Sequence, residues 1–249
     1  MVRAAVLLLL LGCGSVNAVG TPDAAAAMSD AAPGDAASIE GLVAWYRMDT
    51  LAERTASDAT GHHDATCGVG TCPAVSGDGR IDGAYVFDGT DDLIRVPSTA
   101  ELKTPQAFTV TAWINRDPGS TDACIVNKSF GADGNNSWQA CIDEAGSLAF
   151  YSVSASGADT LATAAAVLDT ARWYHLALWW NGTTKAIFID GARTVAKDVP
   201  AISFDDADIT IGSDVDAGAL VGPFSGMVDD VRIYNRALLA AELTALQSP

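Results

Sequence analysis

Short runs of alternating apolar and polar residues, separated by turn sequences, recur from about residue 41 to residue 234. The segment 108–114 (FTVTAWI) alternates cleanly with a period of two, which is typical of a half-buried strand. Asn181-Gly182 and Asp190-Gly191 separate other such runs, and these dipeptides favour tight hairpin turns. Many short strands at this spacing predict an all-β antiparallel sandwich. Only the segment 238–246 has its leucines at helical spacing, which predicts a short C-terminal helix.

The first 40 residues have a different character. Arg3 precedes an apolar run over 4–11, which is far shorter than the ~20 residues that a spanning helix needs, so the pattern predicts a secretory signal peptide. The run ends in Leu-Gly-Cys13 and resembles a bacterial lipobox, in which the cysteine is acylated and becomes the mature N-terminus. We therefore expect a lipoprotein signal peptide over 1–12, lipidated Cys13 with a flexible Ala/Asp/Pro-rich linker over 13–40, and one folded domain over 41–249. An ordinary signal peptide cleaved nearby, for example after Ala18, is the alternative.

The net charge of the chain restricts the classes of partner that it can bind. Fourteen Lys and Arg stand against 31 Asp and Glu, giving a net charge of −17. Nucleic-acid binding through basic patches and polybasic attachment to a membrane surface are therefore excluded. We expect contact with a membrane only through the lipid, and a location at the outer membrane or cell surface, with the periplasmic face left open.

The cysteine count supports the same placement. An odd total of five calls for an explanation in an exported chain, and lipidation of Cys13 leaves four that can pair in three ways. Cys67 and Cys72 are close enough in the sequence for a disulfide that closes a small loop. Cys124 and Cys141 lie in two predicted strands that can be neighbours in a hairpin. We predict these two disulfides. A zinc site is the weaker alternative, because no Cys-x-x-Cys occurs.

Several motifs, taken in order, resemble a bacterial laminin-G-like, concanavalin A-like domain over about 41–246. They are 87–92 (FDGTDD), 93–97 (LIRVP), 108–113 (FTVTAW), 125–128 (IVNK), 173–177 (WYHLA), 187–191 (IFIDG), 209–212 (ITIG) and 229–238 (DDVRIYNRAL). The resemblance implies a two-sheet jelly-roll sandwich. It implies function only broadly, because this fold carries lectins, adhesion modules and glycoside hydrolases.

The sequence offers little for catalysis. Laminarinase-type enzymes of this fold use a Glu-x-Asp-x-x-Glu set, because glycoside hydrolysis needs paired carboxylates. None of the five glutamates falls in such a set, and the acidic segment 205–208 is interpreted as a solvated turn. His175 lies in a family-like strand and is interpreted as structural. We expect no enzymatic activity.

The resemblance also implies a structural calcium ion. Ca²⁺ takes six to eight oxygen ligands, and in many members the first loop and the acidic residue before the final strand supply them. Carried over by position, the ligands are the carboxylates of Asp49, Asp58 and Asp229 and the main-chain oxygens of Gly61 and His63. The alternative is a solvated Asp/Gly turn without a metal.

Candidate ligand-binding residues are an aromatic side chain for stacking and polar groups for hydroxyls. We select Trp138, Tyr151, Asn115, Arg116 and Asn136. The other tryptophans at 45, 113, 173 and 179 alternate with apolar residues and are predicted to be core, and Arg232 and Tyr234 to be structural. The sequence thus predicts a non-catalytic, lectin-like envelope lipoprotein that binds carbohydrate or a surface protein. A glycoside hydrolase or polysaccharide lyase of the same fold and a purely structural envelope protein remain as alternatives.

Overall fold

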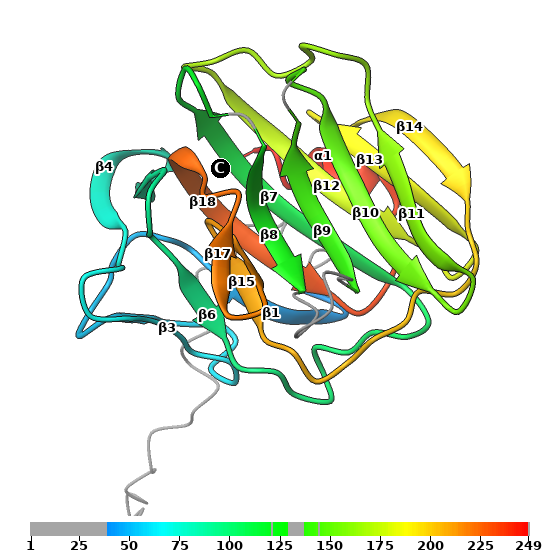
Figure 1. Cartoon of the computed structure of the whole chain (residues 1–249), viewed down its shortest axis with the longest axis horizontal. Helices are drawn as coiled ribbons and strands as arrows, with labels where there is room; N and C mark the ends of the chain where they lie inside the picture. The colour runs from blue at the N-terminus through cyan, green and yellow to red at the C-terminus, as the bar shows by residue number, and fades with distance from the viewer. Residues whose placement is uncertain (1–38, 121, 129–136, 144, 249) are drawn as a thin grey trace, which may run out of the picture.

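The structure is a computed structural model that describes residues 39–120, 122–128, 137–143 and 145–248. Two eight-stranded antiparallel sheets pack face to face as the two layers in Figure 1. This confirms the predicted all-β sandwich with its short C-terminal helix. The predicted signal peptide, lipidated Cys13 and ligand residue Asn136 lie outside the described residues.

Sheet A is the rear layer in Figure 1, with the strand order β14-β13-β12-β7-β18-β5-β4. β1 also pairs with β18, beyond the point where β5 ends its pairing. The strands are β1 (Leu42–Tyr46), β4 (Ala74–Ile81), β5 (Gly83–Asp88), β7 (Phe108–Arg116), β12 (Trp173–Trp180), β13 (Thr184–Ile189), β14 (Ala192–Asp198) and β18 (Ser225–Tyr234).

Sheet B is the front layer, with the order β11-β10-β9-β8-β15-β6-β3-β2. Its strands are β2 (Thr55–Ala56), β3 (Ala65–Cys67), β6 (Ile94–Val96), β8 (Ala123–Lys128), β9 (Trp138–Ile142), β10 (Leu148–Ser154), β11 (Gly157–Ala162) and β15 (Ile209–Ile211). A separate hairpin of β16 (Asp214–Asp216) and β17 (Ala219–Val221) follows β15 and lies in front of sheet B.

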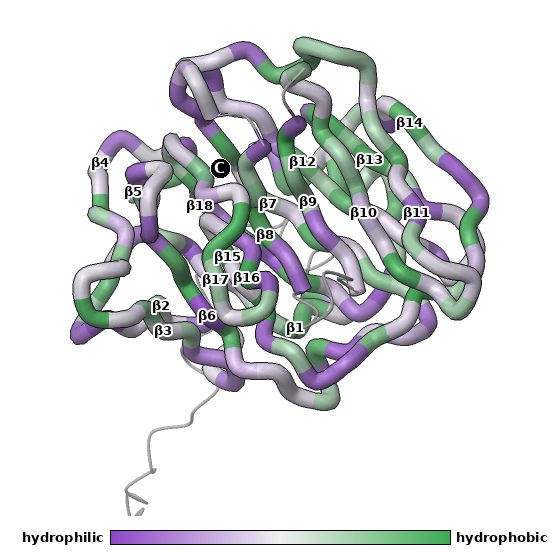
Figure 2. Tube along the Cα trace, viewed as in Figure 1, coloured by the Kyte–Doolittle hydropathy of each residue, from purple (hydrophilic) through white to green (hydrophobic). Residues whose placement is uncertain are grey.

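The core lies between the sheets, where hydrophobic residues concentrate along the strands (Figure 2). Its centre is aromatic: the ring of Phe108 in sheet A lies 5.5 Å from that of Trp138 and 6.0 Å from that of Phe150, both in sheet B. All three side chains are at most 1% exposed. Burying side chains of this size stabilises a fold by roughly 1.5–3 kcal/mol each, so this cluster is a principal link between the layers.

A buried lysine adds a polar link between the sheets. Lys185 of β13 is fully buried and donates to the main-chain oxygens of Phe150 and Asp159 and to Ser152 Oγ at 2.9–3.0 Å. Asp159 also accepts an ion pair from Lys185 at 2.8 Å and another from Lys197. Burial lowers the pKa of Lys185, and the carboxylate of Asp159 partly opposes that shift. The charge is tolerated because every donor has a partner.

The C-terminal segment covers part of the outer face of sheet A. Helix α1 (Ala240–Ala245) is too short to be stable alone, and it is held by Leu243 and Leu246, which pack with Tyr234 of β18. Trp179 fixes the approach by donating from Nε1 to the main-chain oxygen of Leu238 at 2.9 Å. Among the described residues, no helix is long and apolar enough to span a bilayer.

The start of β1 is joined to the segment that directly follows β18. The amide of Asn235 donates to the main-chain oxygen of Gly41 at 2.8 Å, and Arg236 Nε donates to that of Glu40 at 2.7 Å. Gly41 has a φ of +74°, and a Cβ there would lie 2.8 Å from Asn235 Oδ1. Glycine is therefore required at this junction.

Both predicted disulfides are present. Cys67 bonds to Cys72 in the loop that follows β3, and Cys124 of β8 bonds to Cys141, its direct cross-strand partner on β9. Both bonds belong to sheet B or to its loops. Structural disulfides persist in oxidising compartments, so they indicate an exported protein.

Candidate functional site

The loop predicted to hold calcium is organised around the carboxylate of Asp58. Its Oδ1 accepts the amides of Trp45 at 2.8 Å and Thr60 at 3.0 Å, and its Oδ2 accepts the Thr60 hydroxyl and the amide of His63 at 3.0 Å. Burial alone would raise the pKa of Asp58, but these hydrogen bonds lower it. The main-chain oxygen of His63 accepts the hydroxyl of Tyr46 at 2.6 Å. These hydrogen bonds hold the loop together.

The other two predicted carboxylates also hold main-chain amides. Asp49 Oδ1 accepts the amide of Gly83 at 2.9 Å, and Asp229 Oδ2 accepts that of Ile81 at 2.8 Å. Among the described residues, the carboxylates of Asp49, Asp58 and Asp229 do not come together at ligand spacing. Each of the three carboxylates accepts a main-chain amide, and the expectation that Asp49, Asp58, Gly61, His63 and Asp229 form one metal site stays a prediction.

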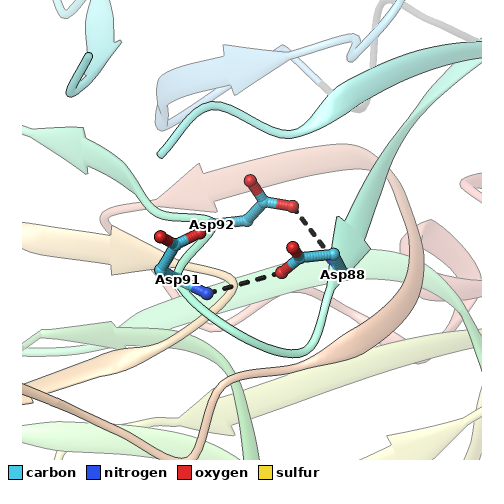
Figure 3. A group of neighbouring side chains, drawn as sticks. All are labelled: Asp88, Asp91 and Asp92. Atoms are coloured by element: carbon cyan, nitrogen blue, oxygen red, sulfur yellow. Dashed lines mark hydrogen bonds between the residues drawn. The ribbon is translucent and has the colours of Figure 1, made fainter. Parts of the chain in front are cut away.

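A different acidic group has metal-ligand spacing. Ligand oxygens of Asp88, Asp91 and Asp92, in the turn after β5, all lie within 4.8 Å of one another and are able to hold a metal ion (Figure 3). Asp88 Oδ1 accepts the amide of Thr90, and Asp92 Oδ2 accepts that of Asp88. Burial, followed by repulsion from Asp88 and Asp91, raises the pKa of Asp92. The sequence showed this turn only as a family-like motif.

Asp229 lies at an irregular point of β18, beside Trp113 of β7. The register shifts after it, and Asp230 takes a positive φ of 49°. Asp229 is fully buried, its Oδ1 has no hydrogen-bond partner among the described residues, and burial raises its pKa to about 7. His175 lies on the other side of Trp113, and burial lowers its pKa to about 4. Two groups whose pKa values are shifted in opposite directions thus lie on either side of Trp113 on the outer face of sheet A.

The structure places Trp138 and Trp45 differently from their sequence predictions. Trp138, chosen for ligand stacking, is 1% exposed in the core between the sheets, because its position on β9 points inward. Trp45, predicted as core, is half-buried on the outer face of sheet A, whereas Trp113 lies on the same face but is only 5% exposed, which confirms its predicted burial. Arginines cover them: Arg47 and Arg232 lie 4.3 Å from the ring of Trp45, and Arg80 lies 4.6 Å from that of Trp113. Trp173 and Trp179 are half-buried on that outer face too.

The remaining predicted ligand residues do not form one site. Asn115 lies on the outer face of sheet A opposite Trp173, whereas Tyr151 lies on the outer face of sheet B. Arg116 anchors loops, since its Nε donates to the main-chain oxygen of Leu168 at 2.8 Å and its Nη1 to that of Ser120 at 3.3 Å. Tyr151 is half-buried, and its cross-strand partners Gln139 and Thr160 are both polar.

Tyr151 belongs to a row of polar side chains that crosses sheet B in register. Each member is the direct cross-strand partner of the next, and the row, named here the polar row, runs Thr160, Tyr151, Gln139, Asn127, Thr210, Arg95, Thr66 and Thr55. Eight strands at the usual spacing give it a length of roughly 34 Å. Such a row offers hydrogen-bonding groups along a line perpendicular to the strands.

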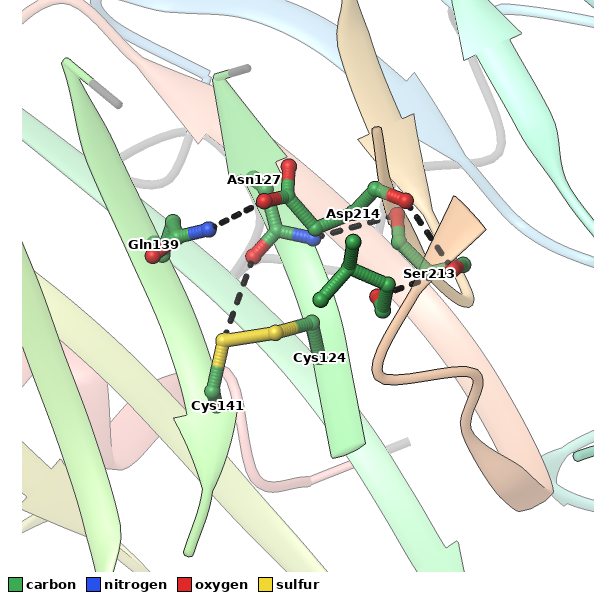
Figure 4. Close-up of a disulfide and its surroundings, with 7 residues drawn as sticks. Cys124, Asn127, Gln139, Cys141, Ser213 and Asp214 are labelled. Atoms are coloured by element: carbon green, nitrogen blue, oxygen red, sulfur yellow. Dashed lines mark hydrogen bonds between the residues drawn. A yellow bond between two sulfur atoms is a disulfide. The ribbon is translucent and has the colours of Figure 1, made fainter. Parts of the chain in front are cut away.

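The hairpin β16–β17 covers the middle of the polar row. Asp214 Oδ2 accepts Gln139 Nε2 at 2.6 Å, and the main-chain oxygen of Ser213 accepts Asn127 Nδ2 at 3.2 Å, beside the disulfide between Cys124 and Cys141 (Figure 4). Asn127 is fully buried beneath these contacts. The accessible part of the polar row that contains an aromatic ring therefore consists of Gln139, Tyr151 and Thr160. Sequence reasoning missed Gln139 and Asn127, because their alignment depends on strand register.

A cavity of about 210 Å³ lies where β1 leads into the loop 47–59, in a part of the molecule that contributes no residue to the accessible part of the polar row. Its buried lining is Tyr46, Met48, Ala56 and Tyr85, and its more exposed lining is Arg47, Asp49, Thr50, Ser57 and Ala59. Of these lining residues, sequence reasoning selected only Asp49.

Residues 88–244 match the concanavalin A-like lectin/glucanases superfamily, which is more than half of the chain. The chain belongs to this superfamily. No curated protein is significantly similar to the sequence.

Solved structures show the same fold at low identity. Domain 4 of AbnA, an extracellular arabinanase from Geobacillus stearothermophilus solved with arabinotriose, is 22% identical with a TM-score of 0.64, and the match covers 83% of this chain and 98% of that domain. The binding domain of Paraclostridial Mosquitocidal Protein 1 is 16% identical with a TM-score of 0.65, over 84% of this chain and 52% of the other. Trypanosoma rangeli sialidase, solved with 2,3-difluorosialic acid, has the same identity and TM-score, but the match spans 33% of that enzyme.

The acidic turn, the polar row and the cavity lie differently with respect to the residues that match the superfamily. The acidic turn and most of the polar row, from Arg95 onward, lie inside the matched residues 88–244. The lining of the cavity, at 46–59 and Tyr85, lies before them. The cavity is thus built from the part of this concanavalin A-like domain that the match does not include.

Proposed function

We propose that this protein is an exported, non-catalytic carbohydrate-binding domain that holds an oligosaccharide on the outer face of sheet B, beside Tyr151. The polar row is the observation that carries this proposal. Its accessible part places a half-buried aromatic ring between the amide of Gln139 and the hydroxyl of Thr160. An aromatic face with hydrogen-bonding groups on both sides suits a sugar ring, which has apolar C–H faces and polar edges.

Two further observations support binding through Tyr151. Burial, with smaller contributions from Asp143 and Asp122, raises the pKa of the Tyr151 phenol, so this hydroxyl stays protonated and is able to donate to a sugar oxygen. The domain of the arabinanase, which this chain matches over nearly its whole length, was solved with an oligosaccharide.

The placement of the described glutamates supports a non-catalytic role. Glu242 pairs with Arg236 at 2.6 Å beside helix α1, and Glu101 contacts His63 at 3.1 Å. Neither contacts a residue of the polar row, and glycosidases use a pair of Asp or Glu carboxylates that flank the bond they cleave. A hydrolase would release reducing sugar from the polymers that it binds, and such release would refute this part of the proposal.

We extend the proposal to the anchor and to calcium. Acylation of Cys13 would tether the domain at the outer membrane or cell surface, and loss of fatty-acid labelling in Cys13→Ala tests this. Calcium at Asp88, Asp91 and Asp92 would relieve the repulsion that raises the pKa of Asp92. A saturable rise in melting temperature with calcium, absent in Asp91→Asn, tests the ion, and no rise at millimolar calcium contradicts it.

The binding test compares matched variants by calorimetry against arabinotriose and a panel of neutral and acidic oligosaccharides. Tyr151→Ala is expected to weaken binding at least tenfold, and Tyr151→Phe to weaken it less, because the ring remains. Thr194→Ala, on the exposed β14 strand, is the control and should bind as the natural chain does. Absence of saturable binding to every glycan would overturn the proposal and favour a protein partner or a purely structural role.

A further inference from the structure

The cavity beside β1 has the chemical make-up of a site for a small polar molecule. Its floor is closed by Tyr46, Met48, Ala56 and Tyr85, each at most 2% exposed. Both tyrosine hydroxyls are already used, since Tyr46 donates to His63 and Tyr85 to Thr50 through main-chain oxygens. The floor therefore offers mainly carbon surface to an occupant.

The rim of the cavity is polar and balanced in charge. It carries one cation, Arg47, one anion, Asp49, and the hydroxyls of Thr50 and Ser57. The guanidinium of Arg47 is held against the ring of Trp45 and has no ion-pair partner among the described residues. Asp49 uses Oδ1 for the amide of Gly83. Opposite charges on one rim favour a neutral ligand that both donates and accepts hydrogen bonds.

The backbone at the rim is held in an unfavourable conformation. Met48 lies between Arg47 and Asp49 and has a φ of +62°, and Glu53 and Arg54 in the same loop are also in the left-handed region. Non-glycine residues are uncommon in this region, and clusters of such strained residues are found at ligand-binding and active sites. The turn at Met48 places the side chains before and after it on the rim, while Met48 itself is buried in the floor.

We infer that this cavity binds one neutral sugar ring, the terminal residue of a glycan. A space of 210 Å³ equals roughly seven water molecules and is smaller than the pockets that hold drug-sized ligands, so it admits a single ring. The closed floor leaves no exit for a continuing chain. Asp49 accepts and Arg47 donates hydrogen bonds to hydroxyls, and the floor packs against the C–H face.

This inference rests on the proposed function, because it assigns the same ligand class to a second site. The two sites recognise different parts of a glycan: Tyr151 contacts residues along a chain, and the cavity encloses a chain end. They lie on different parts of the molecule, in residues 46–59 with Tyr85 and on β9–β11 respectively. Each can therefore be disabled without the other.

The test uses the full ¹⁵N-labelled chain and follows the amide of Gly83 and the indole of Trp45 by NMR. The probes are L-arabinose, D-galactose and D-glucose, with glycine as a zwitterionic comparison. Ala59→Phe fills the cavity from its exposed rim, and Ala201→Phe adds the same ring at another exposed position. Asp49→Asn keeps an oxygen for Gly83 but removes the charge.

We expect at least one monosaccharide to shift the Gly83 and Trp45 signals saturably. Binding should weaken at least tenfold in Ala59→Phe and several-fold in Asp49→Asn, and it should be unchanged in Ala201→Phe and in Tyr151→Ala. Absence of saturable shifts with all three sugars, unchanged affinity in Ala59→Phe, or binding of glycine alone would overturn the inference. If Tyr151→Ala still abolishes binding of arabinotriose, the proposed function survives that failure.

Discussion

The outer faces of the two sheets have different coverings. Sheet A carries the C-terminal segment over one half and arginines over Trp45 and Trp113 on the other. Among the described residues, sheet B carries only the small hairpin β16–β17 and leaves Tyr151 and Thr160 accessible, and both disulfides belong to it or to its loops. The sheet with the more open outer face is therefore the one with the covalent links, and it is the face that we propose for glycan binding.

The largest expected effect comes from the tryptophan that joins the sheets. Trp138→Ala should lower the free energy of unfolding by about 3–5 kcal/mol, because it removes a fully buried ring packed on Phe108. Trp45→Ala, on the outer face of sheet A, should cost clearly less. Urea denaturation of both variants measures the difference, and equal losses would contradict the assignment of Trp138 to the core and Trp45 to the surface.

The pH dependence of stability depends on Asp229 and His175 on sheet A, because their pKa values are shifted in opposite directions. The pKa of Asp229 is raised to about 7, so its contribution to stability is present at low pH and is lost as pH rises through 7. The pKa of His175 is lowered to about 4, so its contribution is present above its ordinary value of 6.5 and is lost as pH falls toward 4. Between pH 4.5 and 6.5 each contribution to the free energy of unfolding changes by roughly 2 kcal/mol, in opposite directions, so the two nearly cancel.

Variants separate these two titrations. In Asp229→Asn, stability should fall on acidification from pH 6.5 to 4.5, because His175 alone remains. In His175→Gln, stability should rise over the same interval. Denaturant midpoints in EGTA-containing buffer measure both slopes, and a flat profile in both variants would show that neither shift exists.

The disulfides test how sheet B is stabilised. Cys124→Ala with Cys141→Ala should cost about 3 kcal/mol, since the closed loop spans 17 residues, and Cys67→Ala with Cys72→Ala about 2 kcal/mol, since it spans five. Thermal unfolding of the two double variants gives the order. A reversed order would mean that local packing, rather than loop length, sets their contribution.

The smallest effect concerns an arginine on sheet A. Arg80→Gln should cost about 0.5–1 kcal/mol, because it removes the cation from the face of Trp113. The emission of Trp113 should shift to longer wavelength as water reaches the ring, whereas Arg193→Gln on β14 is expected to leave emission unchanged. An unshifted spectrum for Arg80→Gln would place another group over Trp113.

Local features of the sequence predicted the elements well. Period-two alternation found strands such as β7, and the positions of Cys124 and Cys141 on adjacent predicted strands gave their pairing. The same alternation does not say which side of a strand faces the other sheet, so Trp138 and Trp45 were assigned to each other's surroundings. Its polar neighbours at 133–137 made Trp138 resemble a surface residue.

The candidate site was less predictable because it depends on pairing between distant segments. Gln139 and Asn127 become neighbours of Thr210 only through the register of β8 with β15, about 80 residues further along the chain. The cavity depends on the turn at Met48 and on Tyr85 from another strand. At Asp58 the difficulty is that one motif fits two roles. The residues that resemble a calcium loop also suit a carboxylate that accepts main-chain amides of nearby residues, as Asp58 does.

The hydrogen bonds between Gly41 and Asn235 and between Glu40 and Arg236 fasten the start of β1 to the segment that directly follows β18, although Glu40 and Arg236 are 196 residues apart in the sequence. β18 is an interior strand of sheet A, because it pairs with β7 on one side and with β5 and β1 on the other. A mechanical load that enters the domain at residue 39 therefore passes directly to an interior strand, and not to a strand at the edge of a sheet.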